Sequence, residues 1–515
     1  MLVRQSSQKG GLAMPPLRWT EQGWQLDASV TGVTIDSRQV RPGYIFVATH
    51  GQAYDGHDFV GEAVSRGAVA VVGERRPVAA LPVPYFCVPS GRVEAAKLAC
   101  RLYNDPSHDL TVVGVTGTNG KTSVVFWLTH LLRFAGRGTG MLSSVVNDLG
   151  QQRLAATLTT PESPDLQRYL AAIRDFGYRY AVVEVSSHGI VQHRIDGVRF
   201  EMAILTNITR EHLDFHKTMA NYVAAKALLF EELPENSAGA MLNADDPYRE
   251  AVQRRLTAPV VTYGLYQADV TAEILDSRPW YTDVRIRWRE QALKARLNHP
   301  GRYNVSNLLA AVGAALRLGV EPAVIAEAIP ALPEVPGRMH MIEVVGGPKV
   351  IVDYAHTPDG LYQTLITVQD LHPAHLWLVF GARGGRDHGK RPEMGRIAAR
   401  WADWIVLTSD SPGLEDPQAI ADDLLTGIHE VDAGRLWKIE LDRAQAIEEA
   451  VLQADAEDII LVTGRGPETY QRFGDQIVPF IDVEVAQKAL DLRRQRGVGG
   501  RIERDGQHQR SHPGV

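Results

Sequence analysis

Cysteine is scarce in this sequence of 515 residues, which contains only Cys87 and Cys100. Two cysteines that lie far apart exclude a disulfide-rich scaffold, and their spacing is not that of a structural zinc site. Such sparing use of cysteine is typical of proteins from reducing compartments. We therefore expect a cytoplasmic protein with free thiols.

Long apolar runs and an excess of positive charge are also missing. The sequence has no stretch of about 18 apolar residues, so we expect no membrane-spanning helix. Residues 1–16 lack the apolar core of a signal peptide. The formal net charge is −7, which gives no bulk attraction for a polyanion, and nucleic-acid binding is not expected.

The remaining composition is that of a globular protein, with 44% hydrophobic and 22% charged residues. A chain of this length predicts about three domains. Turn-forming residues cluster at 103–107 and 333–337 and suggest two domain boundaries. The expected division is a flexible extension (1–20), a first domain (21–106), a central domain (107–335), a C-terminal domain (336–492) and a disordered tail (493–515).

Short, continuous apolar runs recur along the chain and alternate with helical patterns. Runs too apolar to alternate are typical of strands buried on both faces of a parallel sheet. We therefore predict an α/β fold with a small first domain, a doubly wound central domain and a Rossmann-like C-terminal domain. Residues 265–300 differ and suggest an antiparallel excursion. The predicted strands are 44–48, 68–72, 111–117, 180–185, 202–206, 349–353, 376–381, 404–408 and 458–464.

A phosphate-binding loop follows the first central strand. Residues 114–122 read Gly-Val-Thr-Gly-Thr-Asn-Gly-Lys-Thr, and a helical pattern begins directly after them. In such loops, backbone N–H groups at a helix N-terminus cradle phosphate oxygens, a lysine reaches the β- and γ-phosphates, and a hydroxyl can bind Mg²⁺. An ordinary glycine-containing turn is the alternative. The predicted ATP-binding residues here are Gly117, Thr118, Asn119, Gly120, Lys121, Thr122 and Ser123.

Further motifs follow in order, and together with the phosphate loop they resemble the Mur ligases. The motifs are 35–38 (Ile-Asp-Ser-Arg), 159–165 (Thr-Thr-Pro-Glu-Ser-Pro-Asp), 184–194 (Glu-Val-Ser-Ser-His-Gly-Ile-Val-Gln-His-Arg), 206–216 (Thr-Asn-Ile-Thr-Arg-Glu-His-Leu-Asp-Phe-His), 222–226 (Tyr-Val-Ala-Ala-Lys), 301–307 (Gly-Arg-Tyr-Asn-Val-Ser-Asn), 336–338 (Pro-Gly-Arg) and 353–359 (Asp-Tyr-Ala-His-Thr-Pro-Asp). The resemblance covers roughly residues 30–490 and is closest to members that add the third residue of the peptidoglycan stem. Folylpolyglutamate synthases share the loop but do not carry this first domain.

This resemblance implies an ATP-dependent, ADP-forming ligase that joins an amino acid to UDP-N-acetylmuramoyl-L-alanyl-D-glutamate through an acyl phosphate. It implies a role in peptidoglycan synthesis and cell-wall biogenesis, and so in cell shape and cell division. We also expect a monomer. One alternative is a paralogue that ligates an amino acid to another carboxylate in a natural-product or conjugate pathway. Another is a non-catalytic homologue, which the presence of Lys121, Glu184 and Lys226 disfavours.

The resemblance also implies two Mg²⁺ sites and an unusual lysine. The implied catalytic residues are Lys121, Glu184, His212 and Lys226, and the implied metal ligands are Thr122, Glu184, His212 and Lys226. In the family, the lysine that matches Lys226 is carbamylated. Carbamylation inverts the charge of the side chain, so that it attracts Mg²⁺ instead of repelling it. Spacing alone would favour an ordinary lysine on a helix surface.

Substrate contacts are implied for all three domains. Further nucleotide contacts are expected at Asn307 (adenine), at Arg338 and Asp353 (ribose and phosphates) and at His356, which shares a motif with Tyr354. The expected contacts of the uridine-nucleotide substrate are Ile35, Ser37, Gln52 and Ala53 in the first domain, which becomes the UDP-substrate-binding domain, and Thr159, Thr160, Ser186, Gln192 and Arg194 at the peptide end. The amino acid is expected to bind the C-terminal domain at Arg386, Asp410, Ser411, Pro412, Gly413, Gly464 and Glu468.

The sequence departs from the family where the incoming amino acid is recognised. Relatives that use meso-diaminopimelate carry Asp-Asn-Pro-Arg, whereas residues 410–413 read Asp-Ser-Pro-Gly. Without that arginine, a distal carboxylate would lose its bidentate partner. We therefore expect an amino acid with a distal ammonium group, such as L-lysine or L-ornithine, with Asp410 and Glu468 as acidic partners; a small neutral amino acid is next. Alternatively, Arg383 or Arg465 replaces the missing arginine and diaminopimelate is still used.

Overall fold

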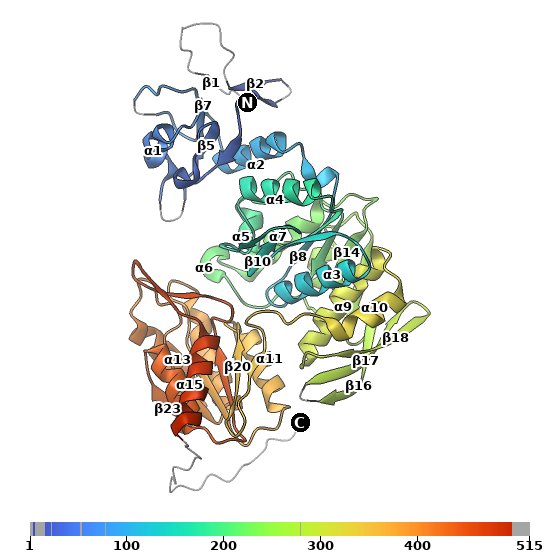
Figure 1. Ribbon diagram of the computed structural model, residues 1–515, viewed down its shortest axis with the longest axis vertical. Helices are drawn as coiled ribbons and strands as arrows, with labels where there is room; N and C mark the ends of the chain where they lie inside the picture. The colour runs from blue at the N-terminus through green and yellow to red at the C-terminus, as the bar shows by residue number, and fades with distance from the viewer. Residues whose placement is uncertain are drawn as a thin grey trace.

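The computed structural model describes residues 4–5, 16–21, 23–51, 54–77, 79–278 and 280–496. Three α/β units follow one another and lie in a row, coloured blue, cyan to yellow, and orange to red in Figure 1. The predicted α/β class with three domains is confirmed. Among the described helices, none combines the length and the apolar character that crossing a membrane requires.

The first unit is a small, mostly parallel sheet with a helix on each face. Its parallel strands are β4 (Gly32–Thr34), β5 (Tyr44–Ala48), β6 (Ala70–Gly73) and β7 (Tyr85–Cys87), and β1 (Arg4–Gln5) joins β7 antiparallel. Residues alternate between the two faces of these strands. One set packs under α1 (Val60–Ser65) and the other under α2 (Gly91–Leu102). Helix α2 also lies against the next unit (Figure 1).

The middle unit contains a sheet of eleven strands with a parallel centre. The parallel strands are β8 (Thr111–Thr116), β9 (Thr139–Leu142), β12 (Tyr180–Glu184), β13 (Met202–Leu205), β14 (Gly239–Asn243) and β15 (Val260–Gly264). The expected antiparallel excursion is present as β16 (Val270–Arg278), β17 (Tyr281–Trp288) and β18 (Gln291–Leu297). At the opposite edge lie β10 (Val146–Asp148) and β11 (Arg153–Ala155).

Helices cover both faces of this sheet, as in a doubly wound fold. One face carries α3 (Lys121–Phe134), α9 (Arg302–Arg317) and α10 (Pro322–Ala328). The other face carries α4 (Ser163–Asp175), α5 (Ser187–Val191), α7 (Met219–Glu231) and α8 (Arg249–Gln253). The short α6 (Leu213–His216) precedes α7. Buried apolar side chains fill both layers, which explains why the central strands are too apolar to alternate.

The last unit is a six-stranded sheet, again with helices on both faces. Its strands are β19 (His340–Ile342), β20 (Lys349–Asp353), β21 (Leu376–Phe380), β22 (Trp404–Leu407), β23 (Leu436–Ile439) and β24 (Ile459–Thr463); only β19 is antiparallel. Its helices are α11 (Pro358–Gln369), α12 (Arg391–Trp401) and α13 (Pro417–His429) on one face and α14 (Arg443–Gln453) and α15 (Asp482–Arg496) on the other. A hairpin of β25 (Tyr470–Phe473) and β26 (Gln476–Pro479) lies beside it.

Two expectations about the chain ends are wrong where the structure describes them. Residues 17–20, expected in a flexible extension, form β2 (Leu17–Thr20), which pairs with β3 (Gly23–Leu26). Leu17 is buried in the first core, and this burial stabilises the hairpin. The tail was expected to begin at 493, but α15 continues to Arg496. Arg493 is buried, and its Nη1 donates to the Val451 carbonyl at 2.7 Å. Residues 497–515 lie outside the described residues.

A fully buried ion pair joins α14 and α15, the two helices on the second face of the last unit. Arg443 at the start of α14 donates from Nε and Nη2 to the two carboxylate oxygens of Asp482 at 2.7 and 2.8 Å. Both side chains are 0% exposed, and Arg443 also donates to the Thr463 carbonyl at the end of β24. The pair therefore holds α15 against the sheet.

We expect Asp482→Ala to destabilise the last unit by about 3–5 kcal/mol, because it leaves a buried guanidinium without its counter-charge. Denaturant unfolding followed by circular dichroism measures this loss. The matched control is Asp491→Ala, since Asp491 forms a looser pair with Arg494 on the exposed side of the same helix. That variant should change stability by no more than about 0.5 kcal/mol. Equal effects of the two substitutions would contradict the structural role of Asp482.

Candidate functional site

A cavity of about 920 Å³ lies between the middle and last units. It is reached by the carboxyl ends of parallel strands from both sheets, where open α/β sheets place their ligands. The predicted residues that line it are Thr118, Asn119, Gly120, Lys121, Thr122, Ser123, Thr159, Glu184, Ser186, Gln192, Arg194, His212, Asn307, Arg338, Asp353, His356, Arg386, Asp410 and Gly464. The predicted residues outside its lining are Gly117, Thr160, Lys226, Ser411, Pro412, Gly413, Glu468, Ile35 and Ser37.

The phosphate loop runs from the end of β8 to the start of α3. Gly117 has φ +148° and Gly120 has φ +82°, and a Cβ at Gly117 would lie 1.8 Å from the Thr206 hydroxyl. Lys121 folds back on the loop, where its Nζ donates to the carbonyls of Gly117 at 3.1 Å and Thr118 at 2.8 Å. Burial lowers the pKa of Lys121. The loop therefore holds its cation through backbone dipoles, which phosphate oxygens can replace.

Thr122, the first residue after Lys121, lies against the carboxylate of Glu184. Its Oγ1 is 3.2 Å from Oε2 of Glu184, which also accepts from the Ser144 N–H at 2.9 Å. Arg338 reaches over from the linker to the last unit and donates to Thr122 Oγ1 at 3.3 Å. A hydroxyl, a carboxylate and a guanidinium thus meet at the start of α3, as binding of a phosphate and a hard cation requires.

Lys226 is buried directly behind the phosphate loop. Its Nζ donates to the Gly117 carbonyl at 2.7 Å and lies 4.6 Å from the centre of the Tyr222 ring. Burial, and then the positive charge of Lys121, hold the pKa of Lys226 well below its ordinary value. A lowered pKa favours the neutral amine, which is the nucleophilic form of a lysine.

His212 precedes α6 and faces the same region. Its backbone has φ +57°, a left-handed conformation that is uncommon outside glycine. Burial and then the proximity of His188 lower the pKa of His212. Within the described part of the chain, its Nδ1 is buried without a hydrogen-bond partner. An orphaned imidazole nitrogen in a strained backbone is suited to a ligand.

The residues expected to contact the nucleotide have different surroundings in the structure. Asn307, expected to contact adenine, lies on α9. Its Oδ1 packs so closely against Gly120 that a side chain at residue 120 would collide with it. The Asp353 carboxylate accepts from the N–H groups of Met339 and Ala355, both at 2.8 Å, and thereby ties the linker to the end of β20. His356 is half-buried, and loss of water around its ring holds its pKa well below the ordinary value.

Of the residues expected to contact the peptide end of the substrate, Thr160 is buried in the protein and Arg194 lines the cavity. Thr160 is 0% exposed and its hydroxyl donates to the Glu184 carbonyl at 2.9 Å. The Arg194 guanidinium donates to the Thr160 carbonyl at 2.9 Å and to Gln192 Oε1 at 2.7 Å. Its Nε is buried with no hydrogen-bond partner among the described residues. Thr160 therefore shapes the wall, and Arg194 is the cation available to a carboxylate.

The residues expected to bind the uridine nucleotide lie in the first unit, away from the cavity lining. Ser37 begins a 3₁₀ turn after β4, and its hydroxyl donates to Glu62 Oε2 at 2.9 Å. Ile35 packs at the edge of the first core. Gln52 and Ala53 lie outside the described residues.

Two carboxylates and two arginines form a compact group at the expected amino-acid site. Asp410 is 1% exposed and lies 3.4 Å from Nη1 of Arg465 and 3.9 Å from Nε of Arg383. Glu468 pairs with Arg383 and accepts from the Tyr354 hydroxyl at 3.3 Å. Arg465 is 0% exposed and committed to Ser411 Oγ and a backbone carbonyl. Of the two arginines, only Arg383 lines the cavity.

The loop that carries residues 410–413 has no cation of its own. Gly413 has φ +60°, and a Cβ there would meet no atom within 4 Å. The φ value disfavours any larger residue at this position. Arg386 also lines the cavity and lies 3.8 Å from Asp214. It is placed to hold an α-carboxylate.

Three contacts between the middle and last units were not predicted. Lys390 donates to both oxygens of Glu211 at 3.0 and 3.2 Å, and both side chains are buried. Arg210 pairs with Asp387 at 3.0 Å. Asn119 of the phosphate loop donates to Asp359 of α11 at 2.9 Å. Asn119, Arg210, Glu211 and Asp359 belong to motifs noted in the sequence, but a pairing between two domains leaves no signal in local spacing.

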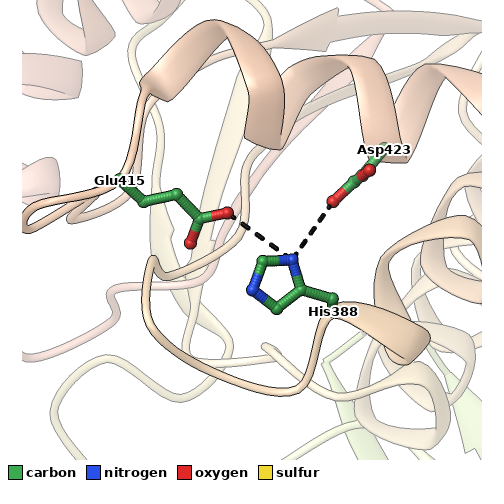
Figure 2. Close-up of side chains that lie close together, drawn as sticks. All are labelled: His388, Glu415 and Asp423. Atoms are coloured by element: carbon green, nitrogen blue, oxygen red, sulfur yellow. Dashed lines mark ion pairs between the residues drawn. The ribbon is translucent and has the colours of Figure 1, made fainter.

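A cluster that resembles a metal site is centred on an arginine instead. Figure 2 shows His388 with Glu415 and Asp423, which lie 3.6 and 3.7 Å from its Nδ1. Among the described residues these three are the single His, Cys, Asp and Glu group with ligand atoms mutually within 4.8 Å. The buried Arg391 already binds Glu415 at 2.6 Å and Asp423 at 2.9 Å. Its single positive charge is shared between the two carboxylates, and the pairs join the start of α12 to α13 and to the loop before it.

Comparison with known proteins finds a family match in each of the three units. The sequence matches the Mur ligase family, catalytic domain over residues 29–98, the Mur ligase middle domain over 115–315, and the Mur ligase, glutamate ligase domain over 337–466. Proteins of Geobacillus thermodenitrificans and Alkalilimnicola ehrlichii are 39% and 41% identical, over 94% and 90% of this chain and 99% and 95% of their own. Each is named UDP-N-acetylmuramoyl-L-alanyl-D-glutamate--2,6-diaminopimelate ligase.

Solved structures agree with this placement. A structure described under the same ligase name is 31% identical and superposes with a TM-score of 0.60, covering 90% of this chain and 95% of its own. The MurF ligase of Thermotoga maritima in complex with ADP has a TM-score of 0.67 at 20% identity, covering 92% of this chain and all of its own. At that identity the second match concerns the fold alone.

We expect Lys121→Ala to lower kcat by about 10²–10³-fold, because the variant loses the cation aimed at the phosphates. ATP-dependent phosphate release measures the effect. The control is Lys294→Ala, since Lys294 is an exposed lysine on β18. Retention of more than a few per cent of the wild-type kcat, by comparison with losses of about 10²-fold, would contradict the assignment of the phosphate loop.

Proposed function

The chain belongs to the Mur ligase family, and on that premise we propose that it adds the third amino acid to UDP-N-acetylmuramoyl-L-alanyl-D-glutamate in peptidoglycan precursor synthesis. As a member of this family it is an ATP-dependent, ADP-forming ligase. The observation that carries the proposal is one cavity lined by Lys121 of the phosphate loop, Arg194 of the middle unit and Arg386 of the last unit. The relatives described above give no support to a ligase for another carboxylate.

The reaction has two steps that these residues serve. A carboxylate oxygen of the D-glutamyl residue attacks the γ-phosphorus of ATP, ADP leaves, and an acyl phosphate forms. The amino group of the incoming amino acid then attacks the acyl carbon, phosphate leaves, and the amine loses a proton. Lys121 would release its loop carbonyls and bind the phosphates. Arg194 would hold the dipeptide carboxylate and Arg386 the α-carboxylate of the amino acid, which together bring the reacting groups together.

Mg²⁺ would supply neutralisation of the phosphate charge, and the donor set suits it. We assign one ion to Thr122. We assign a second to Glu184, His212 and a carbamylated Lys226, as the family resemblance implies. Support comes from the 3.2 Å contact between Thr122 Oγ1 and Glu184, and from the orphaned Nδ1 of His212 among the described residues.

The first unit would bind the uridine nucleotide through Ile35 and Ser37, with Gln52 and Ala53 nearby in sequence. The three units of one chain supply every residue assigned above, so we propose that a monomer is the working form. We place the reaction in the cytoplasm, where a reducing environment suits the free Cys87 and Cys100.

The first test is direct. Purified protein is incubated with ATP, Mg²⁺, UDP-N-acetylmuramoyl-L-alanyl-D-glutamate and a panel of amino acids, and the products are identified by mass spectrometry. Formation of a UDP-linked tripeptide together with ADP supports the proposal. Failure to form it with any amino acid, while ATP is still hydrolysed with a different carboxylate, would contradict it.

We expect Lys226 to carry a carbamate, formed when its neutral amine attacks CO₂ and loses a proton. Lys226→Ala should fold normally, lose turnover by about 100-fold or more, and recover partly with formate or acetate, which restore a carboxylate. A ¹³C-carbamate signal after growth in labelled bicarbonate, absent from the variant, measures the modification. Wild-type-like turnover of Lys226→Ala would contradict this role.

We expect L-lysine or L-ornithine to be preferred over meso-diaminopimelate, although the relatives described above are named for diaminopimelate. The support is local, because Asp410 lines the cavity, Gly413 offers no cation and Arg465 is buried. A desolvated, unpaired carboxylate costs several kcal/mol. A competition assay at equal concentrations gives the answer. A tenfold preference for diaminopimelate in kcat/KM, about 1.4 kcal/mol, would contradict this expectation and favour the alternative in which another arginine replaces the missing one.

A further inference from the structure

Behind Arg194 lies a carboxylate that the reaction does not use. Glu162 ends the loop before α4, and its Oε1 is 3.1 Å from Nη2 of Arg194. Arg194 lines the cavity whereas Glu162 does not, so Glu162 can affect a substrate only through the guanidinium in front of it. An arginine held by a carboxylate and by carbonyl oxygens is fixed in one orientation, which reduces the entropy lost when it binds a second anion.

The other oxygen of Glu162 belongs to a contact between domains. Its Oε2 accepts from Nη1 of Arg92 at 2.9 Å, and Arg92 lies in the first turn of α2 in the first unit. All three side chains are largely buried, with 22%, 20% and 12% exposed for Arg92, Glu162 and Arg194. A row of alternating charge, positive, negative and positive, therefore runs from the first unit to the cavity.

The row has a consequence for the charge that Arg194 presents. A guanidinium paired with one carboxylate has no net charge as a unit and attracts a further anion weakly. With Arg92 on the far side of Glu162, the three side chains carry a net positive charge, and Arg194 remains attractive to a carboxylate in the cavity. Arg92 can supply this charge only while α2 is seated on α4, as it is in this structure (Figure 1).

We propose that Glu162 is a positioning residue for Arg194, and that Arg92 makes binding of the peptide end of the substrate depend on the seating of the first unit. This inference rests on the proposed function, in which the UDP-linked substrate reaches from the first unit to Arg194. The first unit thereby contributes to recognition of the peptide end of the substrate, at a distance from the residues expected to bind the uridine nucleotide. The amino acid and ATP do not use this row.

The test measures the Michaelis constant (KM) for each of the three substrates in the wild-type enzyme and in variants. Glu162→Gln keeps the shape of the side chain and removes its charge, and Arg92→Gln does the same for the arginine. Each should raise KM for the UDP-linked dipeptide about tenfold, the size of one lost hydrogen bond to a charged group. KM for ATP and for the amino acid should stay within about twofold of wild type, since neither touches Arg194. Arg92→Lys should restore most of the affinity.

Two controls distinguish positioning from a structural contribution. Asp165→Asn removes a carboxylate from the first turn of the same helix, where it pairs with Arg168 on the surface, and should leave every KM unchanged. The double variant Glu162→Gln/Arg92→Gln should raise KM for the dipeptide substrate by clearly less than the product of the single effects, because the two side chains act as one unit.

Unchanged KM for the UDP-linked dipeptide in both single variants, with melting temperature unchanged, would overturn the inference. So would multiplicative single effects in the double variant, or an equal rise in all three KM values. These outcomes leave the proposed function intact, because they are measured against wild-type ligation. Absence of ligation in the wild-type enzyme would instead contradict the proposed function itself.

Discussion

Parallel strand pairing is the constraint on which the site depends. In a parallel sheet the carboxyl ends of all strands lie at the same edge, so the loops that follow the strands meet there. The middle sheet brings the phosphate loop after β8 and Glu184 at the end of β12 to one edge. The last sheet brings Asp353 and Asp410 to its own edge. The cavity is formed because these two edges face each other.

Ion pairs hold the two edges together. Glu211 and Lys390 are buried as a pair, and burying either alone would cost several kcal/mol. Much of the attraction within such a pair is offset by the loss of water around both ions. An arrangement built on a pair of this kind is well defined in geometry without being very stable.

Elements with a local pattern could be predicted from the sequence, and contacts between distant elements could not. The apolar runs at 111–117 and 202–206 are strands because burial on both faces demands such runs. The phosphate loop has a spacing that only a few backbone geometries satisfy. Glu162 and Lys390, in contrast, are polar residues in ordinary surroundings until folding brings Arg92 and Glu211 beside them. The strand at 17–20, in which Leu17 alone is buried, was missed because four residues carry too little periodicity.

The bond from Asn119 to Asp359 ties the loop that grips phosphate to a helix of the other domain. The same movement that opens the seam therefore loosens the grip on the nucleotide. Under the proposed function, departure of ADP and entry of a new amino acid would not be independent events, since both would wait for the same opening. The lifetime of the closed form sets an upper limit on turnover, however fast the bond-making steps become.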